Sequence, residues 1–512
     1  MAEVSSGSEE KQALAVLILV GVVAAAVLAA FLGSSLVAQN IGQLALFLAA
    51  VGFVVSFPFP KLAIVLVILF GQIQYLFTGW YGTLISAPIF PPIFQTLDEV
   101  ILLALLGNLI LTKLLKKQPL DKAPALIPLT ALFIVGVVSA RLNDVPVLTG
   151  LVGQRYVFEM AILYLAIINL DLSERYLRSL VYLLLGIGIV QGIVGILEFI
   201  DKYRLYMGGN HDIVQGTWGG GSANYIGIFF FCLAVIALAR LRRNWHGPTG
   251  ALLGFFMLML VLTSCRTGIV LAPLVFLFVL RDKLKNPKYW IAAATGLVFL
   301  FGCLVFYYRN TEAEAVHDLG SSEFVFQFAE RTRVIPVMSQ ILGTNSAFPL
   351  LGASPGTYRT RTGDIYGSKM YLQVESMIRT QEVVAPFIDA SYAIVWMEYG
   401  IVGLILFGLA LLRMFSHAWR HEKIIKSFFW QDYFRALQAI LFIYAFVGGI
   451  FALWTHFQSN IYLWVFAAIG VKYVALQKRA ARQARQIIHT EEETILPQPH
   501  KPVRLGSMAV NR

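Results

Sequence analysis

The chain is poor in charge. Only 13% of its 512 residues are charged, whereas soluble domains carry about 25%. Together with 58% hydrophobic residues, this shortage excludes an ordinary soluble protein. The apolar residues form repeated long runs, not the alternating pattern that a transmembrane barrel requires. Each run is about 20 residues long, as a bilayer-spanning helix needs, so the sequence predicts an all-α polytopic transmembrane helix bundle.

Other absences narrow the function. The 3 cysteines all fall in or beside apolar segments, so they predict neither a disulfide framework nor a metal cluster. The sequence contains no P-loop, no dinucleotide-binding fingerprint and no zinc signature such as HExxH. We therefore expect no cofactor and no metal. No internal repeat is visible, although many transporters contain one.

Fourteen apolar segments are expected to form helices. Two of them, 249–264 and 267–281, are short and are joined by a tight turn. The first segment is too long for a removable signal peptide and is interpreted as an anchor. The segments are 12–31, 42–58, 61–79, 98–115, 123–140, 156–170, 177–200, 224–240, 249–264, 267–281, 289–307, 391–414, 434–453 and 459–476.

Lys and Arg recur in every second loop between these segments. Basic residues near the end of a span stay on the cytoplasmic side, so both chain termini are expected in the cytoplasm. The same loops account for the net charge of +11 without a nucleic-acid partner. The clusters are Lys113, Lys116, Lys117 and Lys122; Arg175 and Arg178; Arg240, Arg242 and Arg243; Arg281, Lys283, Lys285 and Lys288; Arg413, Arg420, Lys423 and Lys426; and Lys478, Arg479, Arg482 and Arg485.

One long polar stretch contains no run that could cross a bilayer, and the alternation of basic loops places it outside the cytoplasm. A site there works without ATP or nucleotide sugars, so its substrate must arrive activated through the membrane. The basic tail is expected to be disordered or bound to the membrane surface. The predicted regions are 1–307 with about eleven helices, the large loop 308–390, three helices in 391–476 and the tail 477–512.

Several arginines lie on the predicted outer face. Arg266, in VLTSCRTGIV, and Arg155, in GLVGQRYVFEM, lie at the membrane edge, and Arg331 and Arg333 lie in the large loop. Two roles fit Arg266: snorkelling at a helix turn, or binding an anion. Loop arginines are often simply solvated. A guanidinium grips phosphate bidentately, however, so the group favours a lipid-linked phosphate or diphosphate as ligand.

Two further segments carry candidate residues. The glycine-rich QGTWGGGSANYIG is either a loop with a helix cap at Ser222 or Asn224, or a place where the backbone approaches a bulky anionic substrate. Asp389 begins the segment after the large loop, where it fits an N-cap, a general base, or both. Glu398 follows inside that helix and is expected to face the bundle interior or an aqueous cavity. Asp98 and Glu99 fit an ordinary cap or a second acidic site.

These motifs resemble the O-antigen ligase and Wzy-type polysaccharide polymerase superfamily of bacterial inner membranes. The resemblance covers about residues 150–410. SANYIGIFF resembles the start of a central helix, and LTSCRTG resembles a Ser-Arg turn. FAERTRVIP followed by FPLLGASPGTY resembles the large-loop motif, and residues 389–403 resemble the helix that closes this loop.

The resemblance implies a metal-independent glycosyltransferase that uses undecaprenyl-diphosphate-linked oligosaccharides. It implies that Asp389 and Glu398 are catalytic, and that Arg266, Arg155, Arg331, Arg333 and Asn224 bind the diphosphate or glycan. The ligases have His at the position of Asp389 and Asn at that of Ala390, whereas the polymerases often have Asp, which favours a polymerase. HDIVQGTW lacks an arginine that the family tends to have.

Three functions remain open. The first is a polymerase of lipid-linked repeats, with a chain-length regulator and export proteins as possible partners besides membrane lipid. The second is a ligase that transfers glycan to lipid A core or to protein. The third is a flippase or other transporter of lipid-linked oligosaccharides, for which broken helices meeting at mid-membrane are expected.

Overall fold

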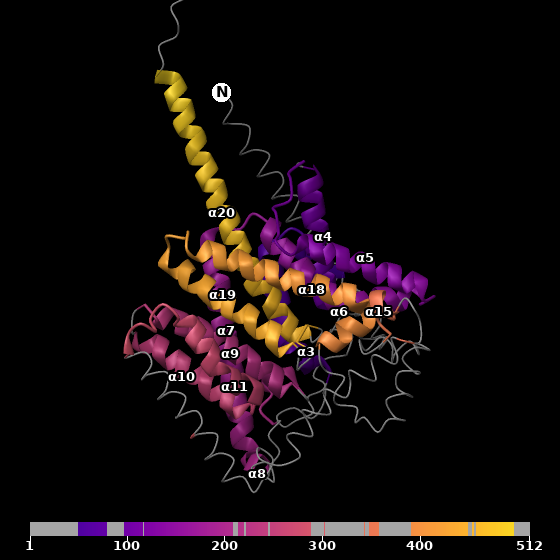
Figure 1. The fold of residues 1–512 in the computed structure, drawn as a ribbon, viewed down its shortest axis with the longest axis vertical. Helices are drawn as coiled ribbons and strands as arrows, with labels where there is room; N and C mark the ends of the chain where they lie inside the picture. Colours follow the sequence, from indigo (N-terminus) through magenta and orange to yellow (C-terminus); the bar gives the residue numbers. More distant parts are fainter. Residues whose placement is uncertain are drawn as a thin grey trace, which may run out of the picture.

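The fold is known from a computed structural model that describes residues 50–78, 97–115, 117–207, 213–219, 222–243, 246–287, 302, 343, 348–357, 391–448, 453–454 and 457–495. Within these ranges the regular elements are helices and none is a strand, which confirms the predicted all-α class. The elements are α3 (Pro60–Thr78), α4 (Leu97–Leu115), α5 (Leu126–Leu142), α6 (Val147–Asn169), α7 (Glu174–Asp201), α8 (Tyr203–Met207), the 3₁₀ helix η2 (Gly216–Trp218), α9 (Ala223–Leu241), α10 (Gly247–Leu262), α11 (Arg266–Val279), α15 (Phe348–Leu351), α18 (Ser391–Glu422), α19 (Phe428–Val447) and α20 (Phe457–Ile495) (Figure 1).

Four of the described helices, α7, α9, α18 and α20, are long and apolar enough to cross a membrane. Helix α6 adds a fifth if its halves, Thr149–Arg155 and Val157–Asn169, form one span bent by 52°. Helices of this length and composition fit a polytopic membrane protein. The predicted segment 12–31 lies outside the described residues, as does 289–307 except for residue 302.

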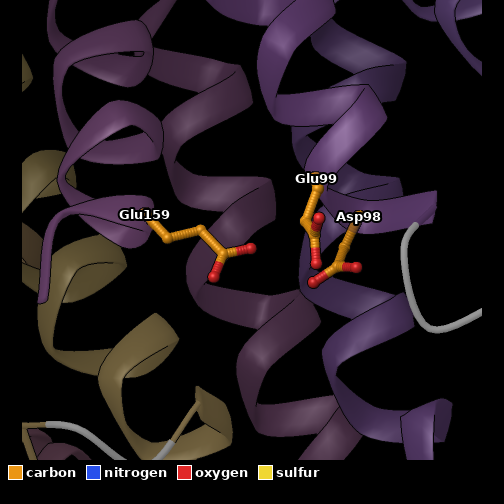
Figure 2. A group of neighbouring side chains, drawn as sticks. All are labelled: Asp98, Glu99 and Glu159. Atoms are coloured by element: carbon orange, nitrogen blue, oxygen red, sulfur yellow. The ribbon is translucent and has the colours of Figure 1, made fainter. Parts of the chain in front are cut away.

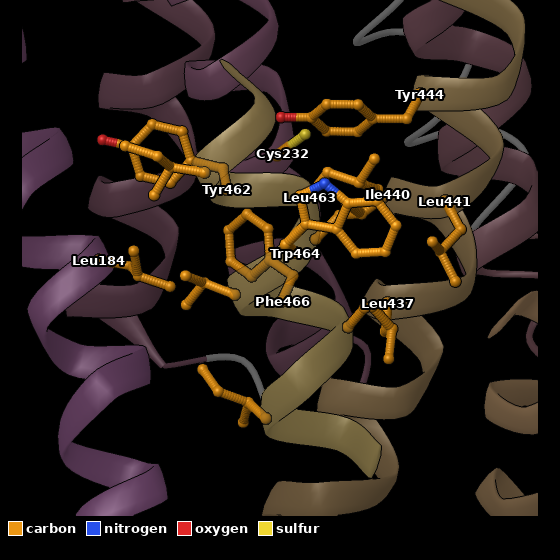
Figure 3. Close-up of a cluster of buried hydrophobic side chains, with 14 of the residues drawn as sticks. Leu184, Cys232, Leu437, Ile440, Leu441, Tyr444, Tyr462, Leu463, Trp464 and Phe466 are labelled. Carbon is orange, nitrogen blue, oxygen red and sulfur yellow. The ribbon is translucent and has the colours of Figure 1, made fainter. Parts of the chain in front are cut away.

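The centre of the bundle is formed by α9 and α20. Helix α9 packs against α10, α11 and α19, and α20 packs against α6 and α19. The rings of Tyr462 and Phe229 stack with centroids 4.0 Å apart, and Trp464 meets Tyr164 edge to face at 5.4 Å. Figure 3 shows Tyr462 and Trp464 among aliphatic side chains and Tyr444. Because these aromatic side chains are buried, they fix how α9, α19 and α20 pack together.

Most predicted segments closely match the observed helices, as α3, α4, α7, α9, α10 and α11 show. Helix α6 is a correction: it begins at Val147 instead of 156, so Arg155 lies inside the helix. The apolar pattern located only the half from Val157 onward, because Thr149, Gly153 and Gln154 interrupt it upstream.

Two further boundaries were predicted wrongly. Helix α19 spans Phe428–Val447 instead of 434–453, because Asp432 and Arg435 near its start are paired with other charges and do not disrupt it. The expectation of a disordered tail is wrong for 477–495, which continue α20. Ala, Arg and Gln dominate the start of this extension and are strong helix formers.

The loops rich in Lys and Arg meet at one end of the bundle, which we call the basic end. The Asp121 amide donates to Asn169 Oδ1 at 2.7 Å, joining the first two of these loops. Trp430 Nε1 donates to Glu174 Oε1 at 2.9 Å. Figure 1 shows α20 running out at the top, with α8 at the bottom.

Candidate functional site

Three groups of residues that the sequence singled out lie away from the basic end. The first is formed by residues 348–357, most of the FPLLGASPGTY motif, which pack on α18. The Ala353 amide donates to Met397 O at 2.7 Å, and the Ser354 amide donates to Glu398 O at 3.2 Å. A motif from the large loop and the helix that follows this loop therefore form one unit.

Helix α5 holds the same segment from the other side. Ser139 Oγ and Asn143 Nδ2 donate to Gly352 O at 2.9 Å and 3.1 Å. Ser139 is fully buried, so its hydroxyl finds in this carbonyl the acceptor that water would otherwise provide. The carbonyl of Gly352 thus accepts two side-chain hydrogen bonds and fixes the segment at the end of α5.

Glycines make this close approach possible. Gly400 interrupts α18 with φ 68° and ψ −173°, a conformation that L side chains rarely adopt. A Cβ there would lie 2.2 Å from Leu350 O, and a Cβ on Gly153 would lie 2.2 Å from Gly356 N. Close packing of backbone on backbone therefore explains the glycines of GASPG and Gly153 of α6.

Glu398 lies two residues before this break and is fully buried. The expectation that it faces the bundle interior is confirmed. Its backbone carbonyl accepts a hydrogen bond from the Ser354 amide, so the segment 348–357 fixes the position of the Glu398 backbone. Asp389, Arg331 and Arg333, the other candidate residues in this region, lie outside the described residues.

The second group joins the motifs SANYIGIFF and LTSCRTG. Cys265 Sγ lies 3.5 Å from Asn224 O, and a Cβ on Gly227 would lie 2.5 Å from Cys265 Cβ. Ser264 between α10 and α11 has φ 52°, which forms the tight turn expected there. Arg266 is exposed at the first residue of α11. The structure therefore brings Arg266 and Asn224 to the same end of neighbouring helices.

The glycine-rich segment before α9 folds back onto α3 and α7. Glu198 Oε2 accepts the amides of Gln215 and Gly216 at 3.0 Å and 2.7 Å. Trp218 Nε1 donates to Gln72 Oε1 at 2.8 Å. Ser222 occupies the N-cap position of α9, but its hydroxyl donates to Gly219 O and caps no helix amide. These hydrogen bonds favour a structural role for residues 215–219.

The third group surrounds Arg155. Its guanidinium pairs with Glu99 Oε1, and its Nε lies 3.3 Å from Glu159 Oε2. Asp98 lies beside Glu99 in the first turn of α4 and is 3% exposed. Asp98, Glu99 and Glu159, here called the acidic cluster, lie together (Figure 2), and two of them, Glu99 and Glu159, pair with an arginine that the resemblance assigns to a diphosphate. A diphosphate would compete with these carboxylates for the guanidinium.

Sequence reasoning missed Glu159. The available signal was its position four residues after Arg155, a spacing that places both side chains on one helix face. A carboxyl group within an apolar helix is itself a functional indication, and that argument was applied to Glu398 alone. Glu198 and Lys472 are also buried charged residues within apolar helices, and they were missed because this argument was not applied to them.

The basic end carries a different set of charges, here called the basic-end network. Glu422 accepts from Arg435 Nε and from Arg281 at 2.8 Å, and Gln438 Nε2 also donates to it at 2.8 Å. Burial lowers the pKa of the Arg281 guanidinium, and neighbouring Arg435 lowers it further, while the Glu422 carboxylate acts in the opposite direction. The network joins the ends of α9, α11, α18 and α19. Its charged members are Arg242, Arg243, Arg281, Asp282, Glu422, Asp432 and Arg435.

A comparison with known protein families found no match, and a comparison with curated proteins found no similar sequence. The resemblance to the ligase and polymerase superfamily stays a prediction from the motifs. The function of the chain has to be argued from the arrangement of its residues.

Proposed function

We propose that the chain is a membrane glycosyltransferase that polymerises undecaprenyl-diphosphate-linked oligosaccharides at the outer face of the bacterial cytoplasmic membrane. One observation carries the proposal: motifs that are distant in the sequence are neighbours in space. The turn before Arg266 contacts the start of α9 at Asn224, and the segment 348–357 contacts α18 at Glu398. Both contacts lie away from the basic end.

In the proposed reaction, an acceptor sugar hydroxyl attacks the anomeric carbon of the lipid-linked donor. A new carbon–oxygen bond forms, the bond between that carbon and the diphosphate breaks, and undecaprenyl diphosphate leaves. Asp389 receives the hydroxyl proton as general base, which typically contributes about 10²–10⁴-fold. Arg266, Arg331 and Arg333 stabilise the negative charge that develops on the diphosphate.

The proposal includes fourteen helices, cytoplasmic termini and a large outer loop. The meeting of the basic loops at one end supports it, because the positive-inside rule assigns one such end to the cytoplasm. Arg266 then lies at the opposite face, where lipid-linked donors carry their diphosphate. Its exposed position at the start of α11 also leaves it close to a helix N-terminus, which favours anions.

The test is elongation of a purified undecaprenyl-diphosphate glycan in detergent, read on a gel. Arg266→Ala should abolish elongation, and Arg266→Lys should restore only part, because lysine lacks the planar fork. Arg175→Ala, at an exposed arginine of the basic end, is the matched control and should elongate like wild type. If Arg266→Ala elongated the glycan fully, Arg266 would have only the snorkelling role. If the wild type did not elongate the glycan, the proposal of a polymerase would be wrong.

A second candidate is a transporter of lipid-linked oligosaccharides. The break at Gly400 in α18 and the 52° bend in α6 favour it, because transporters build midplane sites from discontinuous helices. Elongation in detergent separates the two functions, since transport requires a sealed membrane and extends no glycan. A ligase would instead need a second acceptor, lipid A core or protein, in the same assay.

A further inference from the structure

The acidic cluster gathers three carboxyl groups from two helices. Asp98 and Glu99 lie in the first turn of α4, and Glu159 lies in the second half of α6. One oxygen from each lies within 4.8 Å of one oxygen from each of the others. Figure 2 shows the Glu159 carboxyl group pointing across the interface toward the other two. Carboxylates at this separation repel one another strongly unless positive charge lies between them.

The positive charge that contacts the cluster is too small to balance it. Within the described residues, Arg155 is the cation that pairs with Glu99 and Glu159. Three ionised carboxylates and one guanidinium leave a formal charge of −2, from −3 and +1. Buried charge without compensation costs several kcal/mol, so these carboxyl groups must either take up protons or bind a further positive species.

Two oxygen atoms show where that species would lie. Asp98 Oδ2 and Glu159 Oε1 are buried and accept no hydrogen bond from any described residue. Asp98 is 3% exposed and Glu159 is 8% exposed, so bulk water does not replace the missing donors. Arg155 therefore holds Glu99 and Glu159 on one side and leaves one oxygen of Asp98 and one of Glu159 for another ligand.

We propose that Asp98, Glu99 and Glu159 bind one hard divalent cation, such as Mg²⁺ or Ca²⁺. All three side chains offer oxygen, which these ions prefer, and the cluster contains neither sulfur nor imidazole. A single +2 ion cancels the formal charge of −2. The ion would join the start of α4 to the bent helix α6.

In the basic-end network, in contrast, buried carboxylates are paired with arginines. Asp432 Oδ1 lies 3.3 Å from an Arg242 nitrogen and 3.6 Å from an Arg243 nitrogen. Asp432 is 8% exposed, as Glu159 is. Asp432 is therefore buried to the same extent as Glu159 but lies beside two arginines, which makes it the matched control for the acidic cluster.

The proposal concerns cation binding by the free protein and does not rest on glycosyl transfer, so either can fail alone. The experiment uses full-length protein in lipid nanodiscs, stripped with EDTA and titrated with MnCl₂ under electron paramagnetic resonance. Wild type should bind one Mn²⁺ saturably, and Mg²⁺ or Ca²⁺ should displace it. Asp98→Asn and Glu159→Gln should each weaken binding by more than about tenfold, because each replaces a charged carboxylate ligand with a neutral amide. Asp432→Asn should bind Mn²⁺ like wild type.

Thermal melting provides the second measurement. Mg²⁺ should raise the melting temperature of the wild type and of Asp432→Asn, because a ligand that binds only the folded state stabilises it. It should leave the melting temperature of Glu159→Gln unchanged. The proposal would be overturned if the wild type had no saturable Mn²⁺ site, or if the Asp98→Asn, Glu159→Gln double variant bound Mn²⁺ with wild-type affinity. It would also be overturned if the wild type bound no Mn²⁺ and showed an infrared band of protonated carboxyl groups that the double variant lacks.

Discussion

The two ends of the bundle are held together in different ways. At the basic end, arginines and carboxylates from four helices pair across the ends of α9, α11, α18 and α19. At the opposite end, hydrogen bonds and close backbone contacts join residues 348–357 to α5, α6 and α18, and the three carboxyl groups of the acidic cluster share one arginine. At the basic end every carboxylate of the network contacts at least one arginine, whereas at the opposite end Asp98 pairs with no cation among the described residues.

The largest expected effect comes from removing a charge of the basic-end network. Glu422→Gln keeps the shape of the side chain but removes the charge that faces Arg281 and Arg435. Removing one partner of a buried pair typically costs about 3–5 kcal/mol, because the remaining charges stay buried. We expect the free energy of unfolding in detergent to fall by that amount.

The matched control for this prediction is Glu174→Gln at the same end. Glu174 pairs with Arg178 four residues on, and the two side chains are 36% and 43% exposed. Solvent screens such a pair, so the loss should stay below about 1 kcal/mol. Equal losses in both variants would show that the basic-end network stabilises no more than a surface ion pair does.

A smaller effect is expected at the opposite end, from Gly400→Ala. The new methyl group would lie 2.2 Å from Leu350 O, and alanine would have to adopt φ 68°. Backbone strain of this kind costs about 1–3 kcal/mol. The variant should unfold more easily and should expose 348–357 to protease before the rest of the chain.

Gly408→Ala is the control in the same helix. A Cβ there meets nothing within 4 Å, and alanine favours a helix over glycine by about 0.5–1 kcal/mol. This variant should be as stable as wild type or more stable. If both substitutions have the same effect, the contact between Gly400 and Leu350 does not hold the segment.

The comparison also separates what the sequence could and could not predict. The apolar runs of α7 and α9 located both helices, because spanning helices carry their pattern along their full length. The start of α19 was misplaced because Asp432 looks unfavourable until its partner Arg242, at the end of α9, is known. A charge that is neutralised by a distant residue cannot be recognised from local pattern.

The candidate site follows the same rule. Glu398 was placed in the interior from its position in an apolar helix, and its burial agrees. Asp98 and Glu99 were singled out as a helix cap or a second acidic site, but their contact with Glu159 was not predicted, because α4 and α6 are separated in the sequence by α5 and their contact is tertiary. The glycines of GASPG resembled a family motif, whereas the structure explains Gly352 and Gly356 by close backbone packing against α18 and α6.

The smallest expected effect concerns the extension of α20 beyond the bundle. Arg479 donates to Asp121 Oδ2 at 2.5 Å, which fastens the extension to the loop between α4 and α5. The Arg479 side chain is 41% exposed, so solvent weakens the pair. Arg479→Ala should therefore lower the free energy of unfolding by less than about 1 kcal/mol, and high salt should reduce even this difference.

The control is Arg482→Ala, at an exposed arginine three residues further on, which should leave the free energy of unfolding unchanged. Unfolding curves of both variants at low and high salt provide the measurement. A salt-independent loss as large as that of Glu422→Gln would mean that Arg479 belongs with the buried charges of the basic end, and that this end extends along α20 to the loop before α5.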